Sequence, residues 1–325
     1  MNSPGFSVIL PTYQRKECIC AAVEALGRAE YDGSLEIIVV VDGSNDGTAE
    51  ALRALRLPHP LTVIEQENRG LAGARNRGAH AACGEILLFL DDDMIAQSDI
   101  VRQHALMYRS GADAVHGAIP VHDDCPPNFL TQGIAAWPGC PPDGEPQGTT
   151  HSPFEIYGGH FSVRREVFER LGGFDETFTA DGGYGSEDAD FAARLLDGHT
   201  IAYNRQAISW HRFSVDAREM LKRAFRAGQA HVRFAQRHRR YSRELVTRVD
   251  ECKLSNRLVY RPLARLPFLP FLLTRIVSSM CATALKGEHR SHPLAARLFH
   301  SARQINYWAG VNSAGGFPPV EKARS

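Results

Sequence analysis

The sequence Ile86-Leu87-Leu88-Phe89-Leu90-Asp91-Asp92-Asp93-Met94 decides how this chain is organised. Its first five residues are apolar and have the length of a strand that is buried on both faces of a sheet. Three carboxylates follow without a spacer, so they repel one another, and burial at a strand end would increase that cost. A divalent cation would offset the cost, and hard oxygen ligands here suit Mg²⁺ or Mn²⁺ that also binds substrate phosphates.

An isolated acidic triplet is more often a solvated turn. The buried strand before it favours a metal–phosphate site instead, because open α/β sheets bind ligands beyond the carboxyl ends of their strands.

Strands and helices are predicted to alternate around this stretch. Strands are predicted at 6–10, 35–41, 61–64, 86–90, 114–121, 200–203 and 207–210, with helices such as 71–82, 97–109 and 187–196 among them, and regular structure is expected to resume at 157–163. Pro11 is expected to end the first strand. This alternation predicts an α/β fold with a doubly wound, mostly parallel sheet. From Ser214 the alternation stops, and basic helices are predicted at 220–241 and 244–259.

Charge divides the chain into two parts. Residues 1–211 contain 15 Lys+Arg and 30 Asp+Glu, a net charge of −15, whereas residues 212–325 contain 22 and 7, a net charge of +15. The basic part is expected to face an anionic partner: a membrane surface, a nucleic acid or the acidic part of the same chain. We predict a catalytic domain at 1–213, divided at about 120 into a nucleotide-sugar half and an acceptor half, and a helical extension at 214–325.

Cysteine usage and the amino terminus predict a cytoplasmic protein. The seven cysteines lack the spacing of a disulfide framework or a zinc site, and the first apolar run already resembles a strand rather than a secretory signal. The apolar segment 266–285 contains Pro267, Pro270 and Arg275, so it is expected to lie on a surface, or to pack on the catalytic domain, rather than span a membrane.

Two segments could contact a nucleotide. Asp42 ends the second predicted strand, where its carboxylate could accept from a base imide or a ribose hydroxyl, although Asp42, Ser44 or Asp46 could instead cap the next helix. Residues 68–78 would bring backbone N–H groups and arginines to the same sheet edge, a favourable place for phosphate. The alternative is a glycine-rich turn with surface arginines.

Two further segments could carry catalysis or a metal. Glu187 and Asp188 follow a glycine-rich loop, so a carboxylate there could act as a general base, although acids after a capping Ser186 also suit a first helical turn. His211 follows a predicted strand, and its neutral imidazole could complete a carboxylate-bound metal site, better for Mn²⁺ than for Mg²⁺. A structural histidine is the alternative.

Together these motifs resemble the family 2 glycosyltransferases of the GT-A fold, over about residues 6–211. The matching segments are Val8–Tyr13 (opening strand and nucleotide turn), Val41–Thr48 (second nucleotide motif), Gly73–Asn76, Phe89–Asp93 (the Asp-X-Asp motif), and Gly172–Glu176 with Glu187–Asp190 (acceptor side).

The resemblance implies a role for each matching residue. The residues that would bind the nucleotide sugar are Pro11, Thr12, Tyr13, Arg15, Asp42, Gly73, Arg75, Asp91 and Asp92. Asp93, with His211, would bind the metal, while Asp188 would be the base and Glu187 would help to hold the acceptor. The acceptor pocket would include Trp137, within the Pro- and Gly-rich segment 122–153, together with Tyr184 and Gly185.

The sequence departs from the family pattern at three places. Val41 stands where many members have a second acid before the Asp42-Gly43 pair. Three consecutive acids leave the register of ribose and metal contacts open by one residue. The part after Ser214 matches no catalytic motif.

The predicted function is a metal-dependent, inverting transfer of sugar from a nucleotide-diphosphate sugar to a glycan, lipid-linked or small-molecule acceptor. One alternative is a nucleotidyltransferase that makes a sugar nucleotide, which the glycine-free Pro11-Thr12-Tyr13-Gln14 disfavours. Another is a non-catalytic module that docks on a membrane or another anion. Peripheral membrane contact through the basic C-terminal helices, on the cytoplasmic face, is favoured over nucleic acid.

Overall fold

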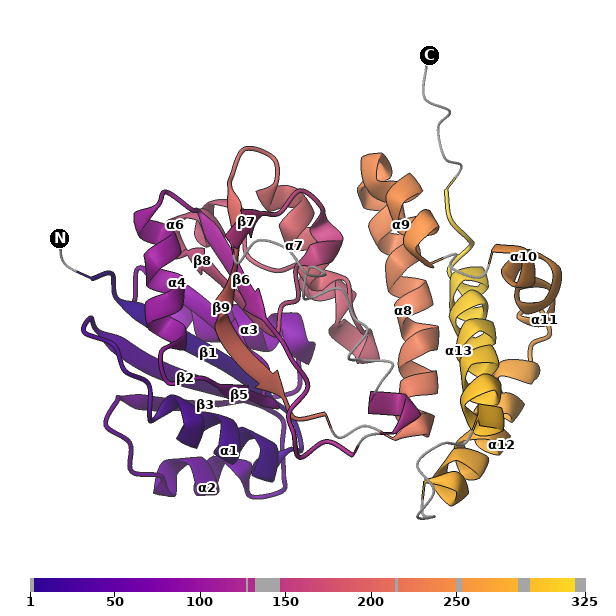
Figure 1. Cartoon of the computed structure of the whole chain (residues 1–325), viewed down its shortest axis with the longest axis horizontal. Coiled ribbons are helices and arrows are strands. Elements are labelled where there is room, and N and C mark those ends of the chain that lie inside the picture. Colours follow the sequence, from indigo (N-terminus) through magenta and orange to yellow (C-terminus); the bar gives the residue numbers. More distant parts are fainter. Residues whose placement is uncertain are drawn as a thin grey trace. The chain divides into compact units, whose positions relative to one another are not determined.

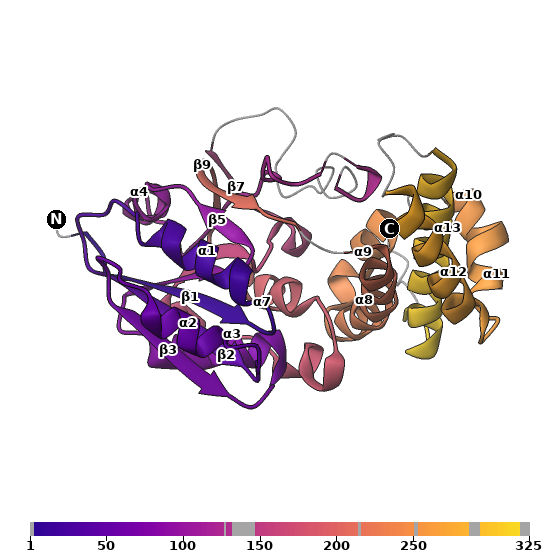
Figure 2. The same ribbon diagram turned by 90° about the horizontal axis from the view of Figure 1, so that it is seen from below.

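The structure is a computed structural model that describes residues 3–126, 128–131, 147–213, 216–249, 253–285 and 293–318. The chain forms two compact units (Figures 1 and 2). Unit 1 comprises Met1–Cys125, Ala135–Gly182 and Glu187–Phe213, and unit 2 comprises Pro126–Ile134, Gly183–Ser186 and Ser214–Ser325. The predicted fold class, an α/β sheet with a helical C-terminal part, is confirmed.

Unit 1 contains a nine-stranded sheet in the order β3-β2-β1-β4-β8-β6-β9-β5, with β7 also paired to β9. Its strands are β1 (Phe6–Thr12), β2 (Leu35–Asp42), β3 (Leu61–Gln66), β4 (Ile86–Leu90), β5 (Met94–Ala96), β6 (Ala114–Ala118), β7 (Gln147–Thr149), β8 (His160–Arg164) and β9 (Ile201–His211). Six strands run in one direction, while β8, β5 and β7 are antiparallel to their neighbours. The carboxyl ends of β1, β2 and β4 therefore meet at one edge.

Three strand predictions were wrong in detail. The strand predicted at 114–121, β6, ends at Ala118. Strand β1 continues through Pro11 to Thr12. The Phe6 N–H donates to Ser34, just ahead of β2, so the backbone N–H groups of the odd-numbered residues of β1 point toward β4. The pairing of β1 with β4 ends at Ile9. Pro11, which has no N–H, therefore stands where β4 requires no hydrogen bond. The two strands predicted at 200–203 and 207–210 form the single strand β9, whose pairing with β6 shifts register after Gly117.

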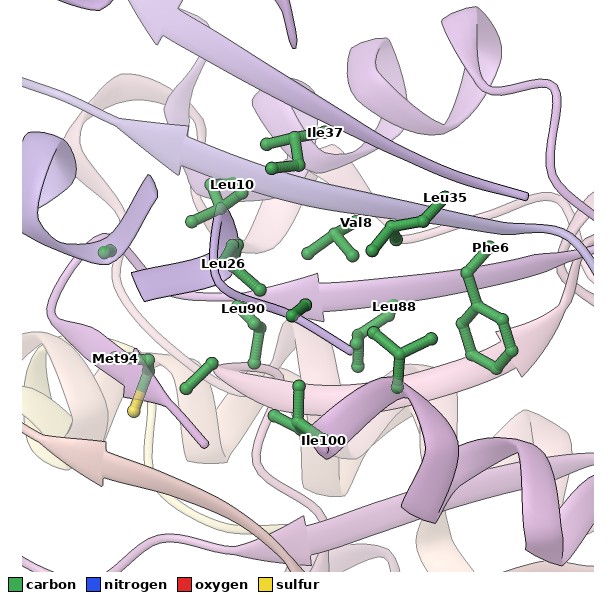
Figure 3. Packing of buried hydrophobic residues seen from close by; sticks show 14 of the residues in the cluster. Phe6, Val8, Leu10, Leu26, Leu35, Ile37, Leu88, Leu90, Met94 and Ile100 are labelled. Atoms are coloured by element: carbon green, nitrogen blue, oxygen red, sulfur yellow. The ribbon is translucent and has the colours of Figure 1, made fainter. Parts of the chain in front are cut away.

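Helices cover both faces of the sheet because successive strand side chains point to opposite sides. Phe6, Val8 and Leu10 pack with α1, α2 and α4 in one core (Figure 3), whereas Ile9 packs in the other with α3, α6 and α7. The helices are α1 (Lys16–Leu26), α2 (Thr48–Ala54), α3 (Gly70–Ala81), α4 (Ile100–Arg109), α6 (Arg165–Arg170) and α7 (Glu187–Leu195), with short 3₁₀ turns at Pro153–Glu155, Glu176–Phe178 and Ala180–Gly182.

Unit 2 is helical. Its elements are α8 (Ala217–Arg237), a 3₁₀ turn (Arg239–Tyr241), α9 (Ser242–Val249), α10 (Lys253–Ser255), a π-turn (Asn256–Tyr260), α11 (Arg261–Leu263), α12 (Leu269–Ala284) and α13 (Pro293–Ser313). Helices α8 and α13 approach closely at Gly228 and Gly310, where a methyl group on either glycine would overlap the facing backbone. Among the described residues, no helix is both long and apolar enough to cross a membrane.

Candidate active site

The three acids after β4, Asp91, Asp92 and Asp93, belong to two neighbouring clusters of polar side chains in unit 1. Asp91 N–H donates to Gly159 O (3.2 Å), and the chain then enters β5, where Met94 pairs with His211 of β9. Thr12 ends β1, the strand next to β4. This geometry brings residues from opposite ends of unit 1's sequence to the edge where parallel strands end.

The first cluster centres on Arg15. Its Nη1 lies 2.6 Å from Asp92 Oδ1 and 2.9 Å from Asp93 Oδ2. Thr12 Oγ1 donates to the other oxygen of Asp92 (2.8 Å), and His211 Nε2 lies 3.3 Å from Asp93 Oδ2. One guanidinium therefore joins two adjacent carboxylates, while each carboxylate keeps a further partner of its own.

The pKa values of the two carboxylates in this cluster are shifted in opposite directions. Burial raises the pKa of Asp92 to about 7, and the negative charge of Asp93 adds to this rise. The positive charge of Arg15 acts in the opposite direction but is outweighed. Burial also acts to raise the pKa of Asp93, but the hydrogen bond and charge of His211, together with Arg15, lower it to about 2. Asp93 is therefore the ionised member at neutral pH.

Asp93 and His211 have the chemistry of a two-residue metal site. Within the described ranges, no group of three or more His, Cys, Asp or Glu side chains converges on one point. A carboxylate and an imidazole 3.3 Å apart nevertheless suit Mn²⁺ when substrate phosphates supply further ligands. Arg15 contacts the same Asp93 oxygen as His211 does. A cation that binds this oxygen would therefore have to displace the Arg15 guanidinium.

The second cluster centres on Arg75 of α3, whose side chain is 1% exposed. Its Nη2 donates to Asp91 Oδ1 (2.7 Å) and its Nη1 to Glu187 Oε1 (2.8 Å) at the start of α7. A methyl group on Gly158 would lie 2.6 Å from Nη1, so the guanidinium needs a glycine there. The Gly158 N–H in turn donates to Asp188 Oδ2 (3.2 Å).

Burial also raises the pKa values of two acids in the second cluster, Glu187 and Asp188. It raises the pKa of Glu187 to about 7, helped by the charge of Asp188 and opposed by Arg75. It also raises the pKa of Asp188, against Arg75 and the N–H groups of Gly158 and Ala189. Among the described residues, Glu187 Oε2 and Arg75 Nε are buried without a hydrogen-bond partner. Such atoms are costly to leave unpaired, so they mark a place where a ligand or water would be stabilised.

Asp42 has a structural role that the sequence analysis did not predict. Its Oδ1 accepts from Gln66 Nε2 (2.7 Å) and from Arg69 N–H (2.8 Å), and its Oδ2 accepts from Gly70 N–H (2.9 Å). Asp42 thus caps α3 rather than the helix that follows it, α2. Sequence reasoning missed Gln66, although a polar residue at the end of the parallel strand beside β2 was the available signal.

The other predicted residues lie in different places. Thr12 is buried and Tyr13 exposed, and Gly73 lies inside α3, where a methyl group would be 2.8 Å from Arg69 Cβ. Tyr184 and Gly185 belong to unit 2, in which the Arg223 guanidinium lies 5.2 Å from the Tyr184 ring centre. Trp137 lies outside the described residues.

Two family models match parts of this chain. Residues 7–172 match the model described as glycosyl transferase family 2, and residues 148–213 match that described as the N-terminal domain of galactosyltransferase.

Curated relatives include two glycosyltransferases. An uncharacterized glycosyltransferase of Bacillus subtilis, YfnE, is 40% identical over 99 residues, which cover 30% of this chain and 25% of that protein. The glucosyl-dolichyl phosphate glucuronosyltransferase of Haloferax volcanii is 27% identical over 214 residues, covering 62% of this chain and 67% of that protein. The chain thus spans about a quarter of the first relative's length.

Two solved structures share the fold. A mannosyltransferase from Pyrobaculum calidifontis in complex with GDP-Man and Mn²⁺ matches with a TM-score of 0.58 and 21% identity, covering 97% of this chain and 88% of that one. S. aureus TarS in complex with UDP-GlcNAc matches with a TM-score of 0.54 and 17% identity, covering 96% and 92%.

Proposed function

The chain belongs to glycosyl transferase family 2, and we propose that it transfers a sugar from a nucleotide-diphosphate sugar to an acceptor hydroxyl. The observation that carries the proposal is the pair of adjacent clusters reached by Asp91, Asp92 and Asp93. One combines carboxylates, an arginine and a histidine, and suits an anionic donor. The other contains acids with raised pKa values, which suits proton transfer.

The donor would bind at the first cluster. Thr12, Tyr13, Arg15 and Asp92 would contact the nucleotide, with Asp42, Gly73, Arg75 and Asp91 completing the donor side. Asp93 and His211 would hold Mn²⁺ or Mg²⁺, and that ion, when bound, would offset the charge of the leaving diphosphate. The GDP-Man and UDP-GlcNAc complexes of proteins with this fold support a donor of this class.

Asp188 would act as the base. It accepts the acceptor's hydroxyl proton while that oxygen forms a bond to the anomeric carbon, and the bond from this carbon to the diphosphate oxygen breaks with its electron pair. A single displacement of this kind inverts the anomeric configuration. Glu187, whose carboxylate is oriented by Arg75, would hold the acceptor.

The acceptor would be a glycan, a lipid-linked sugar or a small molecule. The Haloferax relative, named for a dolichyl phosphate substrate, supports the lipid-linked class. Residues 1–213 would form the catalytic domain, divided at about residue 120, with Trp137, Tyr184 and Gly185 on the acceptor side. Residues 214–325 would form an extension that keeps a cytoplasmic enzyme near a membrane.

A thermal-shift panel tests the donor site. UDP, GDP, dTDP and CDP are each added with Mn²⁺ or with EDTA, since a ligand that binds only the folded state raises the melting temperature. We expect one diphosphate to stabilise the protein, and EDTA or Asp93→Ala to remove the effect. If no nucleotide stabilises the protein with either addition, the proposed donor site is wrong.

A further inference from the structure

Exposed large apolar side chains are concentrated in one segment of unit 2. Within the described ranges, every such side chain except Tyr13 and Leu106 lies between Leu254 and Leu294. Phe268 and Phe271, at the start of α12, are 83% and 74% exposed. Scattered apolar residues are normal on a protein surface, but a concentration of this kind marks an interaction site.

Helix α12 is apolar on two opposite faces. Pro270, Thr274, Val277 and Cys281, spaced by four, three and four residues, are its buried positions, and the last two pack in a core with residues of α8 and α13. The opposite face carries Ser279 and Thr283 together with the exposed apolar side chains Phe271, Leu272, Ile276 and Met280. A helix with apolar side chains on both faces is normally covered on both. We call this second set, with Phe268 and Arg275, the outer face of α12.

The charge around the outer face has one sign. Residues 253–285 contain the five basic residues Lys253, Arg257, Arg261, Arg265 and Arg275 but no Asp or Glu. Arg275 lies one helical turn after Phe271 on the same face, and Arg257, Arg265 and Arg275 are exposed. A partner that covers this face must therefore offer apolar surface together with negative charge.

We propose that the outer face of α12 docks on an anionic lipid bilayer surface. The helix would lie in the plane of the interface, with Phe268, Phe271, Leu272 and Ile276 at the acyl boundary and Arg275 at the lipid phosphates. Guanidinium groups match phosphate geometry, and long side chains carry their charge back to the headgroup level. At 16 residues, α12 is shorter than a membrane-spanning helix, which suits this orientation.

Two features favour lipid over a second copy of the chain. A two-fold dimer places the same patch on both sides, so Arg275 would approach its own counterpart with no acid in residues 253–285 to compensate. A bilayer instead presents phosphate and hydrocarbon in adjacent layers, in the order this face requires. The proposal rests on the membrane contact proposed above for residues 214–325, assigns it to the outer face of α12, and uses residues of unit 2 alone.

Vesicle co-sedimentation of the full chain, without donor, tests the proposal. One set of vesicles contains phosphatidylcholine only, and in the other part of it is replaced by phosphatidylglycerol. We expect binding to the anionic vesicles that weakens with added salt. Phe271→Gln with Ile276→Gln should weaken binding by about tenfold or more, and Arg275→Glu should reduce the preference for anionic lipid.

Leu106→Gln is the matched control, because Leu106 is an exposed apolar side chain of α4 in unit 1, and it should bind vesicles like the parent. Melting temperatures equal to that of the parent would show that the α12 variants remain folded. Absence of binding to either vesicle, or equal binding of parent and double variant, would overturn the proposal. So would a dimer in light scattering that the double variant dissociates, because a second copy would then cover the face.

Discussion

Asp91 and Asp93 stand two residues apart, yet they belong to different clusters. Asp91 pairs with Arg75, whereas Asp93 lies between Arg15 and His211. A buried carboxylate keeps its charge only where partners offset desolvation, and His211 and Arg15 do so for Asp93. The family resemblance left the register of the acids open, and we propose Asp93 with His211 as the pair for a cation because their side chains lie 3.3 Å apart.

Arg75 provides the first prediction at this scale. Arg75→Ala leaves Glu187 buried without its counter-ion, so we expect the free energy of unfolding to fall by about 3 kcal/mol or more in urea titrations. Arg77→Ala is the control, because Arg77 is exposed on the same helix and its loss should change stability by less than about 0.5 kcal/mol. Equal effects of the two substitutions would show that the buried ion pair does not stabilise unit 1.

The second prediction concerns Asp188. Asp188→Asn removes the proposed proton acceptor but keeps the side-chain size, so the transfer rate should fall by about 10²–10⁴-fold while stabilisation by the diphosphate stays unchanged. Sugar transfer and thermal shift are measured on the same preparation. Asp181→Asn is the control, because Asp181 is exposed and has a φ of 52°, which asparagine tolerates. Loss of diphosphate binding in Asp188→Asn would argue against the role as a base.

At the scale of elements, local pattern located most strands and helices of unit 1. Strand β4 has the predicted bounds, Ile86–Leu90, while α3 differs from prediction by one residue at each end and α7 by one residue at its carboxyl end. The main omission was α13 in unit 2, for which no helix had been predicted. Its closest contact depends on Gly310 facing Phe225 of α8, and a glycine inside a helix is unfavourable until a second helix approaches it.

That contact carries the third prediction. Alanine is a better helix former than glycine, so propensity alone would stabilise Gly310→Ala by about 1 kcal/mol. Because the new methyl group would overlap the backbone at Phe225, we expect the opposite sign, with a loss of about 1–3 kcal/mol in thermal unfolding. Asn312→Ala, at an exposed position of α13, should be neutral or stabilising. A more stable Gly310→Ala would contradict the close packing.

At the scale of the whole molecule, buried histidines should limit acid stability. His104, His116 and His160 are buried in unit 1, where His104 Nε2 lies 2.9 Å from His160 Nε2 and His116 Nε2 lies 2.6 Å from Thr150 Oγ1. Burial lowers the pKa of His116 to about 3 and that of His160 to about 4, and it lowers the pKa of His104 well below its usual range.

The fourth prediction follows from these directions. The unfolded chain takes up protons below a pKa of about 6.5 while the folded chain does not, so stability is full above that pH and falls as the pH drops toward about 4. Each histidine contributes a loss of up to about 1.4 kcal/mol per pH unit in this window. Urea titrations at several pH values should show a smaller slope for His116→Gln than for the parent. Equal slopes would show that His116 is not kept neutral by folding.

The sequence alone determined the fold class, the family and which residue types would gather where parallel strands end. These follow from local signals, because apolar runs, turn residues and consecutive acids act over a few neighbouring positions. Only the tertiary structure decided which side chains form ion pairs: Arg75 with Glu187, more than a hundred residues away, and Arg15 with Asp92 and Asp93. It also decided which apolar face of α12 is covered and which is exposed. Such contacts between distant residues depend on how the helices and strands pack against one another. Because the interior is close-packed, they are fixed only when the whole core has assembled.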